Sequence, residues 1–197
     1  MAAPGKSIDG RTARALRTRD AIVEACIALV DEGDLRPTAP RVAERAGVSV
    51  RSVFQHFEDV EGLFAAVGDR VIERLAAFVL LVDPATPLAE RLPAVVHQRT
   101  TLHEALTPIR RATVIHASES KFVHDRLRAG HAFLRGELER AFAPELDAAG
   151  DDRAELLDAV DAVLAWPTWE QLRGLGNCDL DEARAAILRL LRGVFGT

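Results

Sequence analysis

The chain has 197 residues, of which 48% are hydrophobic and 28% are charged, a balance typical of a globular protein large enough to bury a core without disulfides or metals. This composition excludes a mainly disordered chain and a disulfide-stapled miniprotein, and no apolar run approaches the ~20 residues that a membrane span needs. The formal net charge is −5, but it is unevenly distributed: residues 1–57 hold nine basic and seven acidic side chains, and residues 58–197 hold sixteen basic and twenty-three acidic ones. The basic N-terminal part is typical of either a segment that binds an anionic partner or a solvated arm.

Apolar residues recur at helical spacing along the chain, and no run of alternating β-branched residues predicts a strand. In the N-terminal part, helices are predicted over residues 15–32, 39–46, 50–57 and 59–81. Gly33 and Gly47 are expected to end the first two, because glycine tolerates the backbone conformation that terminates a helix. Thr38 and Ser49 are expected to cap the second and the third.

The C-terminal part is also predicted to be helical. Its predicted helices cover residues 88–106, a stretch from 108 onward, and residues 119–142, 152–175 and 179–195. Thr107-Pro108 is interpreted as a cap followed by a first-turn proline, and Pro167 is expected to kink the helix around it. Asp179, with Glu182 three residues later, has the pattern of a capping box.

The segment Thr38–Phe57 has the spacing of a helix-turn-helix. Ala43 is small enough to sit where two short helices cross, Gly47 suits the turn, and Val53 is placed to point back at the first helix. Any helical hairpin with a glycine turn could share this spacing. The basic residues Arg11, Arg14 and Arg17 just upstream favour DNA as the partner, through phosphates or a minor groove.

The stretch Arg19–Val67 resembles the DNA-binding domain of TetR-type transcriptional regulators, through VAERAGVS followed by a hydroxyl residue, an aromatic residue and HF. Trp169, Glu170 and Leu172-Arg173, with the last capped helix, resemble the C-terminal helices of that family, whereas 85–165 is less similar. The resemblance implies an all-α homodimer without enzyme activity that represses by binding a palindromic operator in double-stranded DNA and is released by a small molecule. We expect residues 1–57 to form the arm and helix-turn-helix domain, and residues 58–197 the effector-binding and dimerisation domain.

Carried over to this chain, the resemblance and the helix geometry predict a set of DNA-binding residues: Thr38, Arg41, Ser49, Val50, Arg51, Ser52, Phe54, Gln55 and His56. Arg51 is suited to guanine, Gln55 to adenine and Val50 to a thymine methyl group. The remaining polar side chains are expected at phosphates, although Ser49 could be only a cap and Arg41 only solvated. The family usually has tyrosine in place of Phe54 and often lysine in place of Val60, so the amides that start the fourth helix are expected to hold a phosphate instead.

A second set is predicted to line an effector pocket: Arg99, His103, Thr113, His116, His131, Trp166 and Trp169. Arg99 interrupts an apolar stripe, where it meets either a ligand's carboxylate or carbonyl or an intramolecular ion-pair partner. The histidines either line a ligand pocket or lie in the core or at the surface with hydrogen-bond partners of their own. The two tryptophans either flank a ligand space opened by the kink at Pro167 or pack at the dimer seam.

The last two long helices carry apolar residues on more than one face, which predicts a four-helix bundle between two subunits. The residues expected at that dimer interface are Leu157, Val160, Leu164, Ile187, Leu190, Leu191 and Val194.

Enzyme and metal classes are disfavoured, because the chain lacks HExxH, CxxC, a phosphate-binding glycine loop and GxSxG. We therefore expect no cofactor and no metal. The basic start has no apolar signal stretch, and Cys26 and Cys178 form no motif, which favours free thiols in a cytoplasmic protein with no membrane partner. The alternative function is a helical protein–protein interaction module, which a weak salt dependence of binding would distinguish from a DNA-binding protein.

Overall fold

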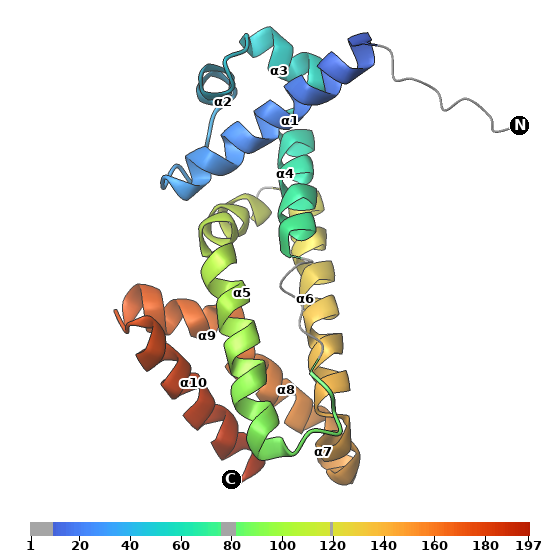
Figure 1. Ribbon diagram of the computed structural model, residues 1–197, viewed down its shortest axis with the longest axis vertical. Coiled ribbons are helices and arrows are strands. Elements are labelled where there is room, and N and C mark those ends of the chain that lie inside the picture. The colour runs from blue at the N-terminus through green and yellow to red at the C-terminus, as the bar shows by residue number, and fades with distance from the viewer. Residues whose placement is uncertain (1–9, 76–81, 119) are drawn as a thin grey trace, which may run out of the picture. The chain divides into compact units, whose positions relative to one another are not determined.

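The computed structural model describes residues 10–75, 82–118 and 120–197, and within these ranges the chain is helical with no β-strand (Figure 1). The predicted all-α class is confirmed. The helices are α1 (Gly10–Asp31), α2 (Ala39–Ala46), α3 (Val50–His56), α4 (Val60–Leu75), α5 (Leu88–Ala117), α6 (Lys121–Ala141), α7 (Ala143–Ala148), the 3-10 turn η2 (Gly150–Asp152), α8 (Arg153–Leu164), α9 (Trp166–Glu170), the π-turn η3 (Gln171–Leu175) and α10 (Leu180–Phe195).

The chain forms two compact units, each with its own apolar core. The first comprises Met1–Arg74 with Pro108–His124, and the second comprises Leu75–Thr107 with Asp125–Thr197. Helices α5 and α6 therefore each supply residues to both units. The predicted boundary after residue 57 falls at the end of the helix-turn-helix and inside the first unit. The assignment of DNA binding to residues 1–57, and of effector binding and dimerisation to residues 58–197, stays a prediction.

In the first unit α1, α2 and α3 pack around one core, in which Ile22, Val42 and Val53 are at most 2% exposed. Arg70 of α4 is tied to α1, since it donates hydrogen bonds of 2.8 Å to both Asp20 and Glu24. Helix α1 begins at Gly10 rather than near residue 15, so the predicted basic arm is, from Gly10 on, the first turns of a helix. The alanines, arginines and leucine of 11–17 are good helix formers, and no proline or internal glycine interrupts them.

The predicted helix start at Thr107-Pro108 is wrong, because α5 runs unbroken from Leu88 to Ala117. Proline removes one backbone donor from a helix but does not prevent packing on both sides from continuing it. The Thr107 hydroxyl donates to the carbonyl oxygen of His103 at 2.7 Å, which places that side chain along the helix instead of at a cap.

Pro167 begins a helix instead of kinking one. Helix α8 ends at Leu164, Ala165 is extended (φ −75°, ψ 153°), and α9 starts at Trp166 with Pro167 in its first turn. A proline is tolerated there because the amide at that position has no partner within the helix. Trp169, only 1% exposed, then packs into the core of the second unit, between residues of α5, α6, α8 and α10.

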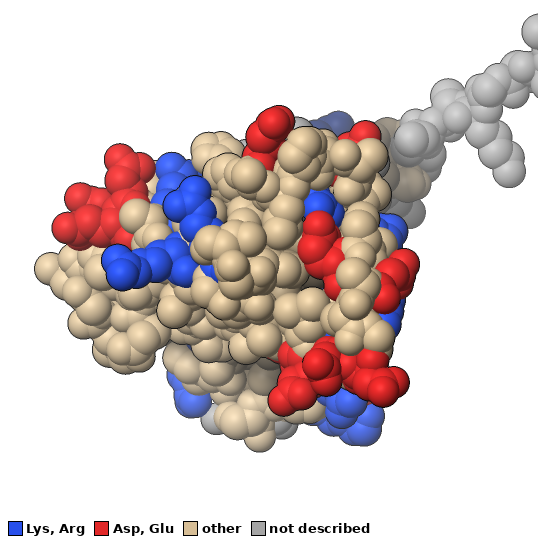
Figure 2. All heavy atoms as spheres, turned by 90° about the horizontal axis from the view of Figure 1, so that it is seen from below, with Lys and Arg blue, Asp and Glu red and all other residues tan. Residues whose placement is uncertain are grey.

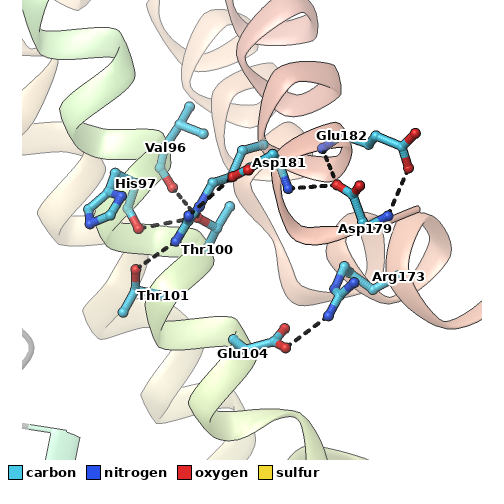
Figure 3. Close-up of polar contacts among 10 residues, drawn as sticks. Val96, His97, Thr100, Thr101, Glu104, Arg173, Asp179, Asp181 and Glu182 are labelled. Atoms are coloured by element: carbon cyan, nitrogen blue, oxygen red, sulfur yellow. Dashed lines mark hydrogen bonds and ion pairs between the residues drawn. The ribbon is translucent and has the colours of Figure 1, made fainter. Parts of the chain in front are cut away.

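Helix α10 and the preceding turn η3 are both fixed to α5 within the second unit by polar contacts (Figure 3). Arg184 donates to the hydroxyls of Thr100 at 3.1 Å and Thr101 at 3.2 Å, and Arg173 pairs with Glu104 at 2.9 Å. The predicted capping box at the start of α10 is confirmed, since Asp179 and Glu182 bond each other's backbone amides. No helix in the described part of the chain is long and apolar enough to cross a membrane.

Candidate functional site

The helix-turn-helix forms because each of its boundaries is specified locally. Helix α2 ends at Gly47, which has left-handed backbone angles (φ 65°, ψ 33°) that glycine adopts without strain. The next helix is capped by Ser49, whose hydroxyl oxygen accepts the Ser52 amide at 3.1 Å. Both predictions are confirmed, while Thr38 occupies the cap position of α2 without a side-chain bond.

Helix α3 presents one face to the core and the other to solvent. Val53 and Phe57 are buried at 2% and 4% exposure. Arg51, Phe54 and Gln55 are exposed, and no hydrogen bond or ion pair within the described residues holds the side chains of Arg51 and Gln55. Since Arg51 and Gln55 lie one turn apart, a polar pair faces outward from α3. Around it, Val50 is exposed, while Ser52 and His56 are half-buried.

The basic residues of α2 are neutralised by acidic residues that precede the helix. Arg41 lies 2.5 Å from Asp34, and Arg45 makes two bonds to the Glu32 carboxylate, at 2.5 and 2.8 Å. The hydrogen bond from Arg45 lowers the pKa of Glu32 below its ordinary value. The Arg41 guanidinium therefore has a carboxylate partner within the chain, and its contact with a phosphate stays a prediction.

The start of α4 also differs from expectation. The carboxylate of Asp59, just before the helix, accepts the Gly62 amide at 2.7 Å. A phosphate at this helix end would meet a carboxylate that already occupies an amide, so the predicted anion site is not supported. The signal for this cap is visible in the sequence, where an aspartate stands three residues before Gly62 at the start of an apolar run.

Five of the residues predicted for an effector pocket lie in the second unit: four make polar contacts within the chain, and the Trp169 ring lies under the Arg173 guanidinium. Arg99 is 5% exposed, donates to the Leu134 carbonyl at 3.2 Å and lies 3.7 Å from Glu137; burial lowers its pKa despite that carboxylate. His103 Nε2 lies 2.9 Å from the Leu164 carbonyl oxygen. The other polar contacts are His131 to Asp161 at 3.2 Å and Trp166 to Thr107 at 3.1 Å.

Thr113 and His116 belong to the first unit instead. The Thr113 hydroxyl donates to the Ile109 carbonyl at 2.5 Å, and the His116 ring lies 4.2 Å from that of Phe64. The seven residues therefore do not line one pocket within either unit. A hollow of about 40 Å³ in the second unit is lined by Arg99, Gln98, Glu137 and Arg140 among others, which is room for a few water molecules.

Most of the predicted dimer interface is the core of the subunit itself. The residues no more than 6% exposed are Leu157, Val160, Leu164, Ile187 and Leu191. They fill the space between α8, α10 and neighbouring helices of the same chain, so a partner subunit does not reach them. Of the predicted interface residues, Leu190, which is 50% exposed, and the half-buried Val194 stay predicted contacts with a partner subunit.

Within the described residues, no group of three or more His, Cys, Asp or Glu side chains could hold a metal ion. Cys26 is buried in the core of the first unit, and burial with the nearby Asp34 charge raises its pKa to about 12. The face seen in Figure 2 carries basic and acidic side chains in small separate groups with uncharged residues between them.

Comparison with known proteins agrees with this architecture. Residues 22–67 match the family model described as bacterial regulatory proteins, tetR family. The chain is similar in structure to a protein from Rhodococcus sp. assigned to the TetR-family transcriptional regulators, with a TM-score of 0.65 and 20% identity over 90% of this chain and 98% of that one. Two further structures are a TetR-like transcriptional regulator from Rhodococcus sp. RHA1 (TM-score 0.60, 16% identity, 93% and 97% coverage) and a protein assigned to the same family from Mesorhizobium loti (TM-score 0.59, 18% identity, 93% and 97% coverage). At these identities the likeness shows the fold. No curated protein matches the chain significantly.

Proposed function

We propose that the chain, whose residues 22–67 match the tetR family of bacterial regulatory proteins, is a DNA-binding transcriptional repressor that binds a palindromic operator as a homodimer and is released by a small molecule. The observation that carries this proposal is the outward face of α3. Arg51 and Gln55 are exposed one turn apart on a short helix held by α1 and α2, without internal partners among the described residues.

The chemistry of this face suits the edges of base pairs. The recognition helix of a helix-turn-helix enters the major groove by its N-terminal half, where Arg51 lies. A guanidinium there donates two hydrogen bonds to guanine O6 and N7, and the Gln55 amide does the equivalent with adenine N6 and N7. Ser49, Ser52, Thr38 and His56 lie at or beside helix ends and carry polar groups that suit phosphates, which position the protein without selecting sequence.

Two-fold symmetry of the protein then requires two-fold symmetry of the DNA. Two α3 helices in a dimer would meet major grooves about one helical turn, ~34 Å, or a multiple of it apart. A ligand that binds better to a dimer with a different spacing releases the DNA by shifting the population toward that state. The larger second unit is the expected place for such a ligand, and Leu190 with Val194 is the expected contact between subunits.

The test begins with selection of bound fragments from random or genomic DNA, followed by affinity measurements on the enriched sequence. A palindromic consensus is expected, and a pool without any consensus would overturn the proposal. Arg51→Ala should remove ~1–3 kcal/mol of discrimination at one base pair in each half-site. Arg128→Ala, which removes an exposed arginine of α6, is the matched control and should leave the footprint unchanged.

A further inference from the structure

Two apolar side chains stand on the solvent side of α3, beside the polar pair. Val50 is 39% exposed and the Phe54 ring is 49% exposed. They are four residues apart, so they are neighbours along one face of the helix. Helix α3 is held in the core by Val53, with Phe57 just beyond its end, and exposure of a valine and a phenylalanine on a seven-residue helix stabilises nothing within the unit. The pair is therefore available to contact a partner that meets the outward face of α3.

The groups that these side chains recognise follow from what a major groove offers. Neither side chain can hydrogen-bond, so neither holds a phosphate or reads a donor or acceptor on a base. The apolar group that base pairs present in the major groove is the C5 methyl of thymine. We infer that Val50 and Phe54 form a methyl-reading pair that selects thymine in each half-site. This inference rests on the proposed function and names a specificity element of the same site.

Because few cations around α3 are free, apolar contacts supply a larger share of the free energy of DNA binding. Arg51 is the single Lys or Arg of this helix, Arg41 and Arg45 are paired with carboxylates, and Asp59 occupies the start of α4. Fewer free cations mean fewer phosphate contacts and a shallower dependence of affinity on salt. Apolar contacts with bases are not screened by salt. Their contribution to affinity therefore persists at ionic strengths where phosphate contacts weaken.

The geometry also predicts where the thymines lie. Val50 adjoins Arg51 and Phe54 adjoins Gln55, so the apolar pair and the polar pair run side by side with the same spacing. One helical turn rises ~5.4 Å, which corresponds to between one and two base-pair steps of ~3.4 Å. We therefore expect thymine methyls within one or two base pairs of the guanine that Arg51 contacts.

The experiment replaces each thymine of the selected operator by deoxyuridine, which removes only the methyl group. At one or two positions per half-site the dissociation constant should rise about fourfold, the factor that corresponds to one buried methyl of ~0.8 kcal/mol. Phe54→Ala and Val50→Ala should each bind the thymine and uracil forms equally at one of these positions. Val114→Ala, which shortens a 45% exposed valine on α5, is the matched control and should keep the wild-type preference.

The outcomes separate this inference from the function on which it rests. Specific operator binding with no response to uracil at any position would overturn the methyl-reading pair and leave the repressor intact. A uracil effect that persists in both alanine variants would also overturn it, because another group would then be reading the methyl. Failure to select any operator would instead overturn the proposed function. Circular dichroism of both variants should match the wild type, since the two side chains are exposed.

Discussion

Replacing Arg91 by methionine is expected to destabilise the second unit by about 3 kcal/mol, because it leaves a covered carboxylate without its cation. The Arg91 side chain is 2% exposed and lies 2.5 Å from Glu145, whose side chain is 20% exposed. It also donates to the Ala141 carbonyl at 2.5 Å and lies over the Phe142 ring at 5.6 Å. Breaking a fully buried pair costs about 3–5 kcal/mol, and the residual exposure of Glu145 places the expected value at the lower end.

A second variant shows whether the loss comes from the stranded charge. In Arg91→Met with Glu145→Leu no charge remains, so at least half of the lost stability should return. Urea unfolding followed by tryptophan fluorescence is the assay, since Trp166 and Trp169 are the two tryptophans of the chain and both lie in the second unit. Arg128→Met, at an exposed site, should change stability by less than about 0.5 kcal/mol. The reasoning is refuted if Arg91→Met costs under about 1 kcal/mol, or if the double variant is as unstable as the single one.

Three further results are expected. With its pKa raised to about 12, Cys26 has roughly one thiolate in ten thousand molecules at pH 8. A disulfide reagent should therefore modify only Cys178 until urea unfolds the chain. Rapid reaction of both thiols in the folded protein would contradict this. Gly176→Ala would place its Cβ 2.8 Å from a backbone carbonyl of η3 and should cost about 1–3 kcal/mol in urea unfolding, whereas Gly193→Ala, with open space around it, should cost nothing; equal effects would refute the steric argument. Leu190→Glu should give folded monomers in sedimentation, and a persistent dimer would place the interface elsewhere.

The features that sequence reasoning predicted correctly are those fixed within a few residues. Gly47 and Ser49 specify the turn between α2 and α3, and the Asp179–Glu182 capping box specifies the start of α10. In each case the side chain that sets the conformation lies within three residues of the backbone that adopts it. The division of α3 into a buried and an exposed face is likewise a consequence of its periodicity.

Predictions that depended on distant parts of the chain were less successful. Helical spacing on α8 and α10 indicates an apolar face but not which chain covers it, and residues such as Val160 and Ile187 are covered by their own subunit. The passage of α5 through Pro108 is equally a matter of tertiary context, since packing overrides a local helix breaker. The pairing of Arg41 with Asp34, seven residues away, depends on how the loop between α1 and α2 folds back.

That loop has a consequence for how the protein would distribute itself in a cell. With the guanidinium groups of α2 already matched by Asp34 and Glu32, the attraction to arbitrary DNA is reduced, because such attraction is almost wholly electrostatic. A genome offers millions of decoy sites, and a weak hold on each of them keeps more copies free in solution. If the chain binds the operator proposed above, fewer molecules per cell then suffice to occupy that site, and its occupancy changes more steeply with their number.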